Sequence, residues 1–219
     1  LIASIHNEKA NGKNQNNMAM CLAKSTDNGD SWIILGRIME QHFYGDTLNN
    51  VCGSNPVVKD GYVYIYYNEA DTIKGTESHG AVIRAKLNDV LKAAAENTVC
   101  KWNKYYNGKW NEPGLRGRST STGSSNIGNH SHIAWSEYAH EFINASYNRE
   151  VFASPDGLTW RSLGTWPGTD AFYFSIVNPD KSFNGIITGH EFYVYYADIT
   201  KLASGNWFRV KVQLGSSKK

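Results

Sequence analysis

The stretch "NPVVKDGYVYIYYNE", residues 55–69, decides the fold. A short apolar run is followed by Asp60 and Gly61, and then by a run rich in Tyr, Val and Ile. Turn residues between two β-branched and aromatic runs are typical of two short β-strands joined by a tight turn. The same order returns in "HSHIAWSEYAHEFINASYN" (130–148), and the strand "GHEFYVYYAD" (189–198) follows "FYFSIVNPDKS" (172–182) in the same way. The chain therefore repeats one β unit.

The repeat predicts an all-β fold, a β-propeller of the five-bladed type with about four blades visible in this chain. Each unit takes up about 45 to 60 residues, the size of a propeller blade of four short strands. One short helical insertion is expected at "LNDVLKAAAEN" (87–97), with Asn88 or Asp89 as its N-cap. The whole of 1–219 is expected to form a single propeller domain.

The first residues match the middle of a blade. "LIASIHNE" (1–8) resembles the second strand "YVYIYYNE" (62–69) down to the closing Asn-Glu. The domain is thus expected to begin inside a blade, with an open edge that a missing N-terminal segment or another chain would pair with.

Two turns share an order of Ser, Asp, Gly and Trp: "AKSTDNGDSW" (23–32) and "FASPDGLTW" (152–160). Ser and Asp side chains can bond the backbone of a tight turn, Gly supplies a permissive backbone angle, and Trp is expected to pack under the next strand. Both are interpreted as structural turns at the blade rim.

Composition limits the partners. The 219 residues carry a net charge of +2 from 22 basic and 20 acidic residues that are well mixed, so we expect no nucleic-acid partner and no membrane partner. The three Cys have no C-x-x-C spacing, which argues against a zinc cluster. The sequons that begin at Asn129 and Asn144 fit a secreted or periplasmic protein.

The three repeat stretches resemble the five-bladed propeller glycosidases, including the family-43 glycoside hydrolases. The two Ser/Asp turns resemble the Asp boxes of sialidases, whose arginine cluster and tyrosine nucleophile match no local motif here, so that relation ranks second. The resemblance implies a glycoside hydrolase that acts on a polysaccharide or oligosaccharide. It implies no cofactor, although Ca²⁺ or Na⁺ on the propeller axis is common among such proteins.

Propeller sites form where inner strands converge on a central funnel, and a sugar needs donors, acceptors and aromatic faces there. Glycoside hydrolysis usually takes two carboxyl groups. We predict Glu8 and Glu69, at equivalent places in successive blades, as the catalytic pair. The predicted substrate-binding residues are His6, Asn55, His130, His132, Tyr173 and Asp198. No metal-ligand set is predicted.

The family-43 acidic triad is not matched. Asn55 stands where the pattern has Asp, "NHSHIAW" offers His where it has Glu, and the first of the three strands is absent. Three hypotheses stay open: a neighbouring hydrolase group with different acids, a hydrolase whose key acid lies in an absent N-terminal segment, and a lectin-like propeller that binds carbohydrate without cleaving it. A protein-binding scaffold is a distant alternative.

Overall fold

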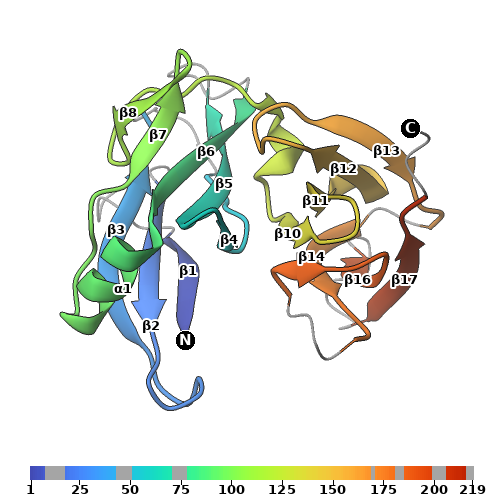
Figure 1. Ribbon diagram of the computed structural model, residues 1–219, viewed down its shortest axis with the longest axis horizontal. Coiled ribbons are helices and arrows are strands. Elements are labelled where there is room, and N and C mark those ends of the chain that lie inside the picture. The colour runs from blue at the N-terminus through green and yellow to red at the C-terminus, as the bar shows by residue number, and fades with distance from the viewer. Residues whose placement is uncertain are drawn as a thin grey trace. The chain divides into compact units, whose positions relative to one another are not determined.

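The computed structural model describes residues 1–7, 18–42, 51–70, 78–168, 171–180, 185–198 and 206–215 (Figure 1). These residues form four sheets, and α1 is the one α-helix among them. The chain divides into two compact units, Leu1–Asn129 and His130–Lys219, called unit 1 and unit 2. No helix of the described part is long and apolar enough to cross a membrane.

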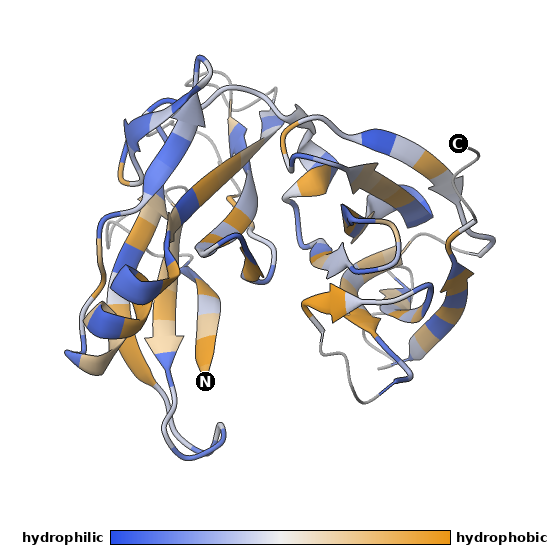
Figure 2. Cartoon of the chain, viewed as in Figure 1, coloured by the Kyte–Doolittle hydropathy of each residue, from blue (hydrophilic) through white to orange (hydrophobic). Residues whose placement is uncertain are grey.

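The first sheet of unit 1 is an antiparallel meander of three strands in the order β1-β2-β3. Its strands are β1 (Ile2–Asn7), β2 (Ala19–Lys24) and β3 (Ile33–Glu40). The central strand β2 is paired on both edges and is buried along nearly its whole length, and its Met20 and Leu22 belong to the core of unit 1. Figure 2 shows hydrophobic colours on these strands and hydrophilic colours on the turn between β2 and β3.

The second sheet of unit 1 has the order β4-β5-β6-β7-β8, with β9 paired to β6. Its strands are β4 (Val57–Lys59), β5 (Tyr62–Ala70), β6 (Ser78–Lys86), β7 (Asn103–Tyr106), β8 (Lys109–Pro113) and β9 (Gly123–Ser124). The turn at Asp60 and Gly61 joins β4 to β5 as predicted, and both residues have positive φ. The core of unit 1 includes Met20, Leu22, Ile65 and Ile83.

A short 3₁₀ helix, η1 (Ser125–Ile127), packs against β5 and β6. Gly128 follows it, and a Cβ there would lie 2.1 Å from the carbonyl carbon of Tyr67. Only Gly therefore fits at position 128, where the chain passes close to the backbone of β5.

The predicted helix exists, but its cap was assigned wrongly. Helix α1 (Leu87–Ala95) begins directly after β6, and its N-cap is Lys86, whose side chain makes no capping hydrogen bond. Asn88 and Asp89 lie inside the first turn, because the last strand residue already has the extended backbone of a cap position. Asp89 still favours the helix N-terminus electrostatically.

Unit 2 contains two sheets. The first has the order β13-β12-β11-β10-β15, in which β15 pairs parallel to β10, and the second has the order β14-β16-β17. The first comprises β10 (His132–Ser136), β11 (Glu141–Ser146), β12 (Glu150–Ser154), β13 (Arg161–Thr165) and β15 (Ile187–Thr188), and the short 3₁₀ helix η2 (Tyr147–Arg149) follows β11. The second comprises β14 (Ala171–Val177), β16 (Glu191–Asp198) and β17 (Trp207–Gln213). The two sheets share a core that includes Ile143, Trp166, Phe192 and Val194.

The two Ser/Asp turns have the hydrogen bonds that the sequence predicts. The Ser25 hydroxyl donates to Asp27 and accepts from the backbone of Gly29 at 2.8 Å. In the second turn the Ser154 hydroxyl donates to Asp156 and accepts from the backbone of Gly157 at 2.8 Å. The expected packing of the first Trp was wrong: Trp32 is 43% exposed and its indole N–H donates to the Gly29 carbonyl, since the turn itself offers that acceptor.

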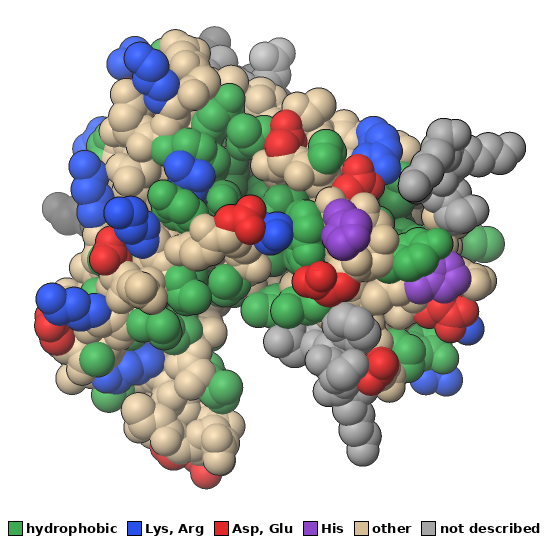
Figure 3. Space-filling model, in the orientation of Figure 1, with side chains coloured by type: hydrophobic (Ala, Val, Ile, Leu, Met, Phe, Trp, Pro, Cys, Tyr) green, Lys and Arg blue, Asp and Glu red, His purple; other side chains and the backbone are tan. Residues whose placement is uncertain are grey.

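Four mainly antiparallel sheets of this kind are the blades of a β-propeller, so the predicted fold class is confirmed. Five blades and a single domain over 1–219 stay predictions. On the face drawn in Figure 3, acidic and basic side chains occur on both units.

Candidate functional site

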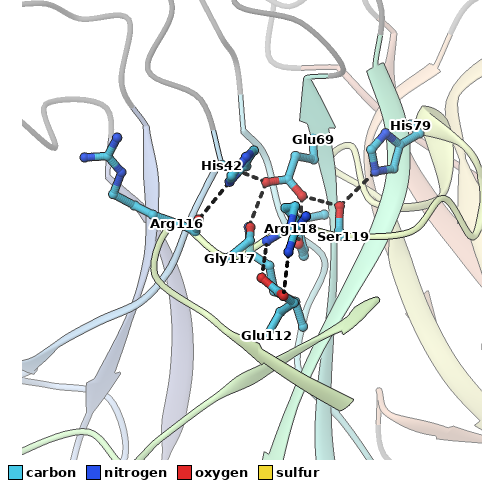
Figure 4. Close-up of polar contacts among 10 residues, drawn as sticks. His42, Glu69, His79, Glu112, Arg116, Gly117, Arg118 and Ser119 are labelled. Carbon is cyan, nitrogen blue, oxygen red and sulfur yellow. Dashed lines mark hydrogen bonds and ion pairs between the residues drawn. The ribbon is translucent and has the colours of Figure 1, made fainter. Parts of the chain in front are cut away.

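The Glu69 carboxylate, near the end of β5, is the centre of a buried polar cluster in unit 1 (Figure 4). Glu69 is 2% exposed, and its two oxygens accept four hydrogen bonds. The donors are Lys104 Nζ at 2.7 Å, the His42 backbone N–H at 2.7 Å, the Tyr67 hydroxyl at 3.2 Å and the Ser119 hydroxyl. Such a set offsets the cost of taking a charged group out of water. We call Glu69, Lys104, Ser119 and His79 the Glu69 centre.

Lys104, on β7, carries the positive charge that pairs with the Glu69 carboxylate. Its side chain is 0% exposed, and Nζ donates to Glu69 and, at 2.8 Å, to the carbonyl of Gly117. It also lies 5.4 Å from the centre of the Tyr67 ring. Burial lowers the pKa of Lys104, and the Glu69 carboxylate opposes that effect. The pair is therefore held by its geometry in an environment that neither charge would tolerate alone.

Two further carboxylates, Glu112 and Glu40, act electrostatically on Lys104. Glu112 accepts from the Arg118 backbone N–H at 2.9 Å and lies 3.6 Å from the Arg118 guanidinium. Glu40 is bound by Arg37 at 2.8 Å. Three acidic groups thus surround one buried ammonium, and the two outer acids each have an arginine of their own.

A hydrogen-bonded chain leads from Glu69 toward the surface. His79 faces Glu69 across the β5/β6 ladder, and its Nε2 lies 2.8 Å from the Ser119 hydroxyl. Since Ser119 donates its one proton to Glu69, its oxygen accepts from His79. His79 and Ser119 are only half-buried, so this chain connects a closed carboxylate with the surface.

Sequence reasoning found Glu69 but missed the three residues around it. Lys104 lies in the aromatic run "KWNKYY", and Ser119 follows in a Ser/Gly-rich stretch, 35 and 50 residues from Glu69. Neither belongs to a motif that predicts contact with a carboxylate. The only local signal was the polar ending of β5 itself.

The other described residues predicted for unit 1 lie on or beside other strands. Glu8, the second predicted acid, lies outside the described residues. His6 is on β1, and its Nε2 lies 3.1 Å from the sulfur of Met18. Asn55 precedes β4 and donates to the carbonyl of Pro56 at 3.2 Å. The roles of these residues stay predictions.

In unit 2 the predicted residues lie along β14. The ring of His130 lies 5.1 Å from that of Tyr173, which is 47% exposed. His132 Nδ1 accepts the backbone N–H of Ile176 at 3.1 Å, and burial lowers the pKa of His132 to about 4. Asp198 ends β16 opposite Ala171 and is 1% exposed.

Their spacing of two residues alone would place His130 and His132 on the same face of one strand, but the structure differs. Strand β10 begins at His132, and His130 has a φ of 49° in the left-handed region. The chain therefore turns before the strand starts, so period-two alternation does not extend to His130.

Unit 2 also has an open groove of about 890 Å³. Tyr138, Leu163, Trp166 and Val210 line it, together with the bidentate ion pair between Glu141 and Arg161. None of the predicted site residues lines this groove. Within the described ranges, no group of three or more His, Cys, Asp or Glu side chains is placed to hold a metal ion.

Chemically, the Glu69 centre holds a carboxylate in a buried place, and its hydrogen bonds continue through Ser119 to the half-buried His79. It cannot offer a free lone pair to a ligand without displacing a donor.

No family model matches the sequence, and no curated protein sequence matches it. Solved structures with similar folds are propeller glycoside hydrolases. Fructan 1-exohydrolase IIa from Cichorium intybus matches with a TM-score of 0.54 and 10% identity, over 92% of this chain and 37% of that one.

Two other structures give weaker matches. A structure titled glycoside hydrolase has a TM-score of 0.49 and 13% identity, over 89% of this chain and 61% of that one. The Penicillium chrysogenum α-L-arabinanase complexed with arabinobiose has a TM-score of 0.43 and 12% identity, over 90% of this chain and 68% of that one. The chain thus spans less than two thirds of the first two proteins, and the likeness is one of fold.

Proposed function

We propose that the protein is a glycoside hydrolase that cleaves an oligosaccharide or polysaccharide, with Glu69 as one carboxyl group of its catalytic pair. The observation that carries the proposal is the buried Glu69 carboxylate, held by Lys104 and linked to the surface through Ser119 and His79. A propeller fold like that of a fructan exohydrolase supports it as analogy.

The hydrogen bonds of Glu69 indicate its part in the reaction. The two oxygens of Glu69 accept four hydrogen bonds, one of them from an ammonium, so neither is placed to donate to a leaving group. Glu69 therefore suits the role of a charge-stabilising carboxylate, and the general acid must be another residue. Glu8, which the repeat places equivalently in the preceding blade, is the acid that we propose.

A second candidate function is carbohydrate binding without cleavage. It is favoured by the 2% exposure of Glu69 and by its full set of donors, which are features of a structural ion pair. In that case the Glu69 centre stabilises unit 1, and the ligand is bound elsewhere.

The test is incubation of the purified chain with neutral polysaccharides, namely arabinan, an inulin-type fructan and xylan, with measurement of released reducing ends. Wild-type protein should release sugar from at least one of them. Glu69→Gln alone would leave Lys104 buried without its counter-charge, so loss of turnover in this variant has two explanations. The double variant Glu69→Gln with Lys104→Met removes both charges and keeps a neutral hydrogen-bonding side chain at position 69.

If Glu69 is catalytic, the double variant should fold with a thermal midpoint near that of the wild type and lose at least about 100-fold in turnover. Glu112→Gln is the matched control, since it neutralises an acid of the same cluster and should keep most activity. Turnover in the double variant equal to that of the wild type would remove Glu69 from the mechanism. Retention of polysaccharide by a wild-type chain that releases nothing would favour the binding function.

A further inference from the structure

Four half-exposed aromatic or imidazole rings meet at the start of β14 in unit 2. The ring of Phe172 lies 4.2 Å from Tyr173, 4.9 Å from Tyr147 and 4.9 Å from His130. Tyr173 is the most open of them, with 47% of its surface exposed. We call these four residues the aromatic platform. Rings of this size are normally buried further, since each carries a large apolar area.

The backbone that presents the platform is strained. His130, Asn148, Arg149 and Tyr173 all have positive φ, at 49°, 60°, 60° and 52°. For a bulky residue such as Tyr173 this left-handed conformation is a genuine outlier, and strain of this kind gathers at binding sites. The pairing of β14 with β16 is also irregular between Phe172 and Ser175. The strain thus coincides with the residues that hold the rings at the surface.

Two polar atoms beside the platform lack a partner within the described part of the chain. The Ser146 hydroxyl and Arg149 Nε are buried and unsatisfied, and they flank Tyr147 on either side. An unsatisfied buried polar group costs free energy unless water or a ligand reaches it. Both atoms are closed off from the surface, so they add to the cost of holding this segment and are not contacts for a ligand.

The charges of the platform side chains indicate which class of ligand fits. None of the platform side chains has a fixed charge, and the nearby Arg149 guanidinium donates to the carbonyl of Trp166 at 2.9 Å. Binding of single-stranded nucleic acid uses aromatic stacking together with a basic groove along the backbone, and the four platform side chains themselves supply no such set of charges. A neutral ligand with an apolar face and a polar edge fits better, and a sugar ring has both.

We propose that the aromatic platform binds a neutral sugar ring by stacking, with Tyr173 as the main contact. This inference rests on the proposed carbohydrate function, but it does not require that Glu69 cleaves anything. It places a carbohydrate-binding surface in unit 2 and names neutral polysaccharide as the class of ligand.

The test is affinity electrophoresis of the full chain in native gels that contain arabinan, inulin-type fructan, xylan or, as the acidic comparison, polygalacturonate. Two substitutions separate the ring from the backbone. Tyr173→Phe keeps the ring, and Tyr173→Asn removes it while keeping a residue type that tolerates positive φ. Tyr138→Asn is the matched control, since Tyr138 is a 44% exposed Tyr of the same unit whose ring lies 4.5 Å from that of His190.

The wild type, Tyr173→Phe and Tyr138→Asn should be retarded by at least one neutral polysaccharide with similar affinity, and Tyr173→Asn should bind it at least five-fold more weakly. Equal retardation of Tyr173→Asn and wild type would overturn the proposal. So would equal losses in the Tyr173→Asn and Tyr138→Asn variants, preference for polygalacturonate, or no retardation of the wild type by any gel.

This outcome can be told apart from that of the hydrolase proposal. Retardation that depends on Tyr173, without release of reducing ends, would support the platform and contradict the enzyme. If the Tyr173→Asn variant releases reducing ends and is retarded as the wild type is, the result would support the enzyme and contradict the platform.

Discussion

The Glu69 centre of unit 1 and the aromatic platform of unit 2 differ in what they bury. At the Glu69 centre, charged groups are taken inside and every oxygen of the carboxylate is occupied. At the platform, apolar rings stay half-exposed and the backbone takes up the strain.

The difference predicts how the free energy of unfolding of each unit responds to substitutions. Removing one partner of a buried ion pair leaves an uncompensated charge, so unit 1 should be sensitive to single substitutions and tolerant of matched double ones. The Tyr173 ring is exposed and uncharged, so its removal leaves no buried charge behind and should change the stability of unit 2 little. The predictions below probe this contrast.

The largest effect is expected at Lys104. Lys104→Met leaves Glu69 buried without a counter-charge and should destabilise the protein by about 3 to 5 kcal/mol. The double variant with Glu69→Gln should recover most of that loss. Denaturant unfolding measures both, and Lys101→Met, at an exposed Lys of the same run, should be near neutral. A Lys104→Met protein as stable as the wild type would show that the pair is not held out of water.

A pH dependence is expected in unit 2 from His132, whose pKa is lowered to about 4 by burial. The unfolded chain, with a pKa near 6.5, binds the proton first as pH falls, so folded stability is fully present above pH 6.5 and declines toward pH 4. The loss should reach about 3 kcal/mol. Thermal unfolding of the wild type and of His132→Gln between pH 4 and 7.5 checks this, because the variant should lack this part of the slope. Parallel curves for the two proteins would contradict it.

A smaller loss is expected from the Ser/Asp turns, one in each unit. Ser154→Ala removes the acceptor for the buried Gly157 N–H and should cost about 1 kcal/mol. Ser25→Ala removes the same acceptor for Gly29 and should cost a similar amount. The midpoints of denaturant unfolding measure both losses. Clearly unequal losses would mean that the two turns are not equivalent structural units.

The smallest effect is expected at the ion pair of Glu141 and Arg161 on the groove of unit 2. Arg161 is exposed, so Glu141→Gln should cost only about 0.2 to 1 kcal/mol despite the bidentate geometry, and less at high salt. Thermal midpoints at low and high ionic strength measure it. A loss as large as that of Lys104→Met would remove the contrast between buried and exposed pairs.

Local patterns in the chain were enough to predict the strands. Alternation in "YVYIYYNE" and "HEFYVYYAD" depends on neighbours two residues apart, and β5 and β16 form over these residues. The Ser/Asp turns were predictable for the same reason, since their hydrogen bonds join residues two to four positions apart. The helix was predicted to within two residues, while its cap was not, because β6 runs directly into it.

The candidate site was only partly predictable. Glu69 and Tyr173 were predicted as site residues from their places near strand ends, and their roles stay predictions; the exposure of each side chain was not foreseeable. Glu69 is closed by groups from other elements, and Tyr173 is opened by a left-handed backbone that no local pattern indicates. Tyr147 and Phe172 were not predicted as site residues, because their ring contact joins η2 to β14 and is seen only in the structure.

By itself, the sequence of this protein determines an all-β propeller fold, its repeated units and its turns, because the hydrogen bonds and side-chain alternation involved are local. Only the tertiary structure decides that Lys104 neutralises Glu69, that Ser119 and His79 cover it, and that His132 binds the backbone of Ile176. Lys104 and Ser119 lie 35 and 50 residues from Glu69 along the chain, and Ile176 lies 44 residues from His132. Charge compensation and burial depend on what packs around a group, and packing brings together residues whose spacing along the chain carries no signal.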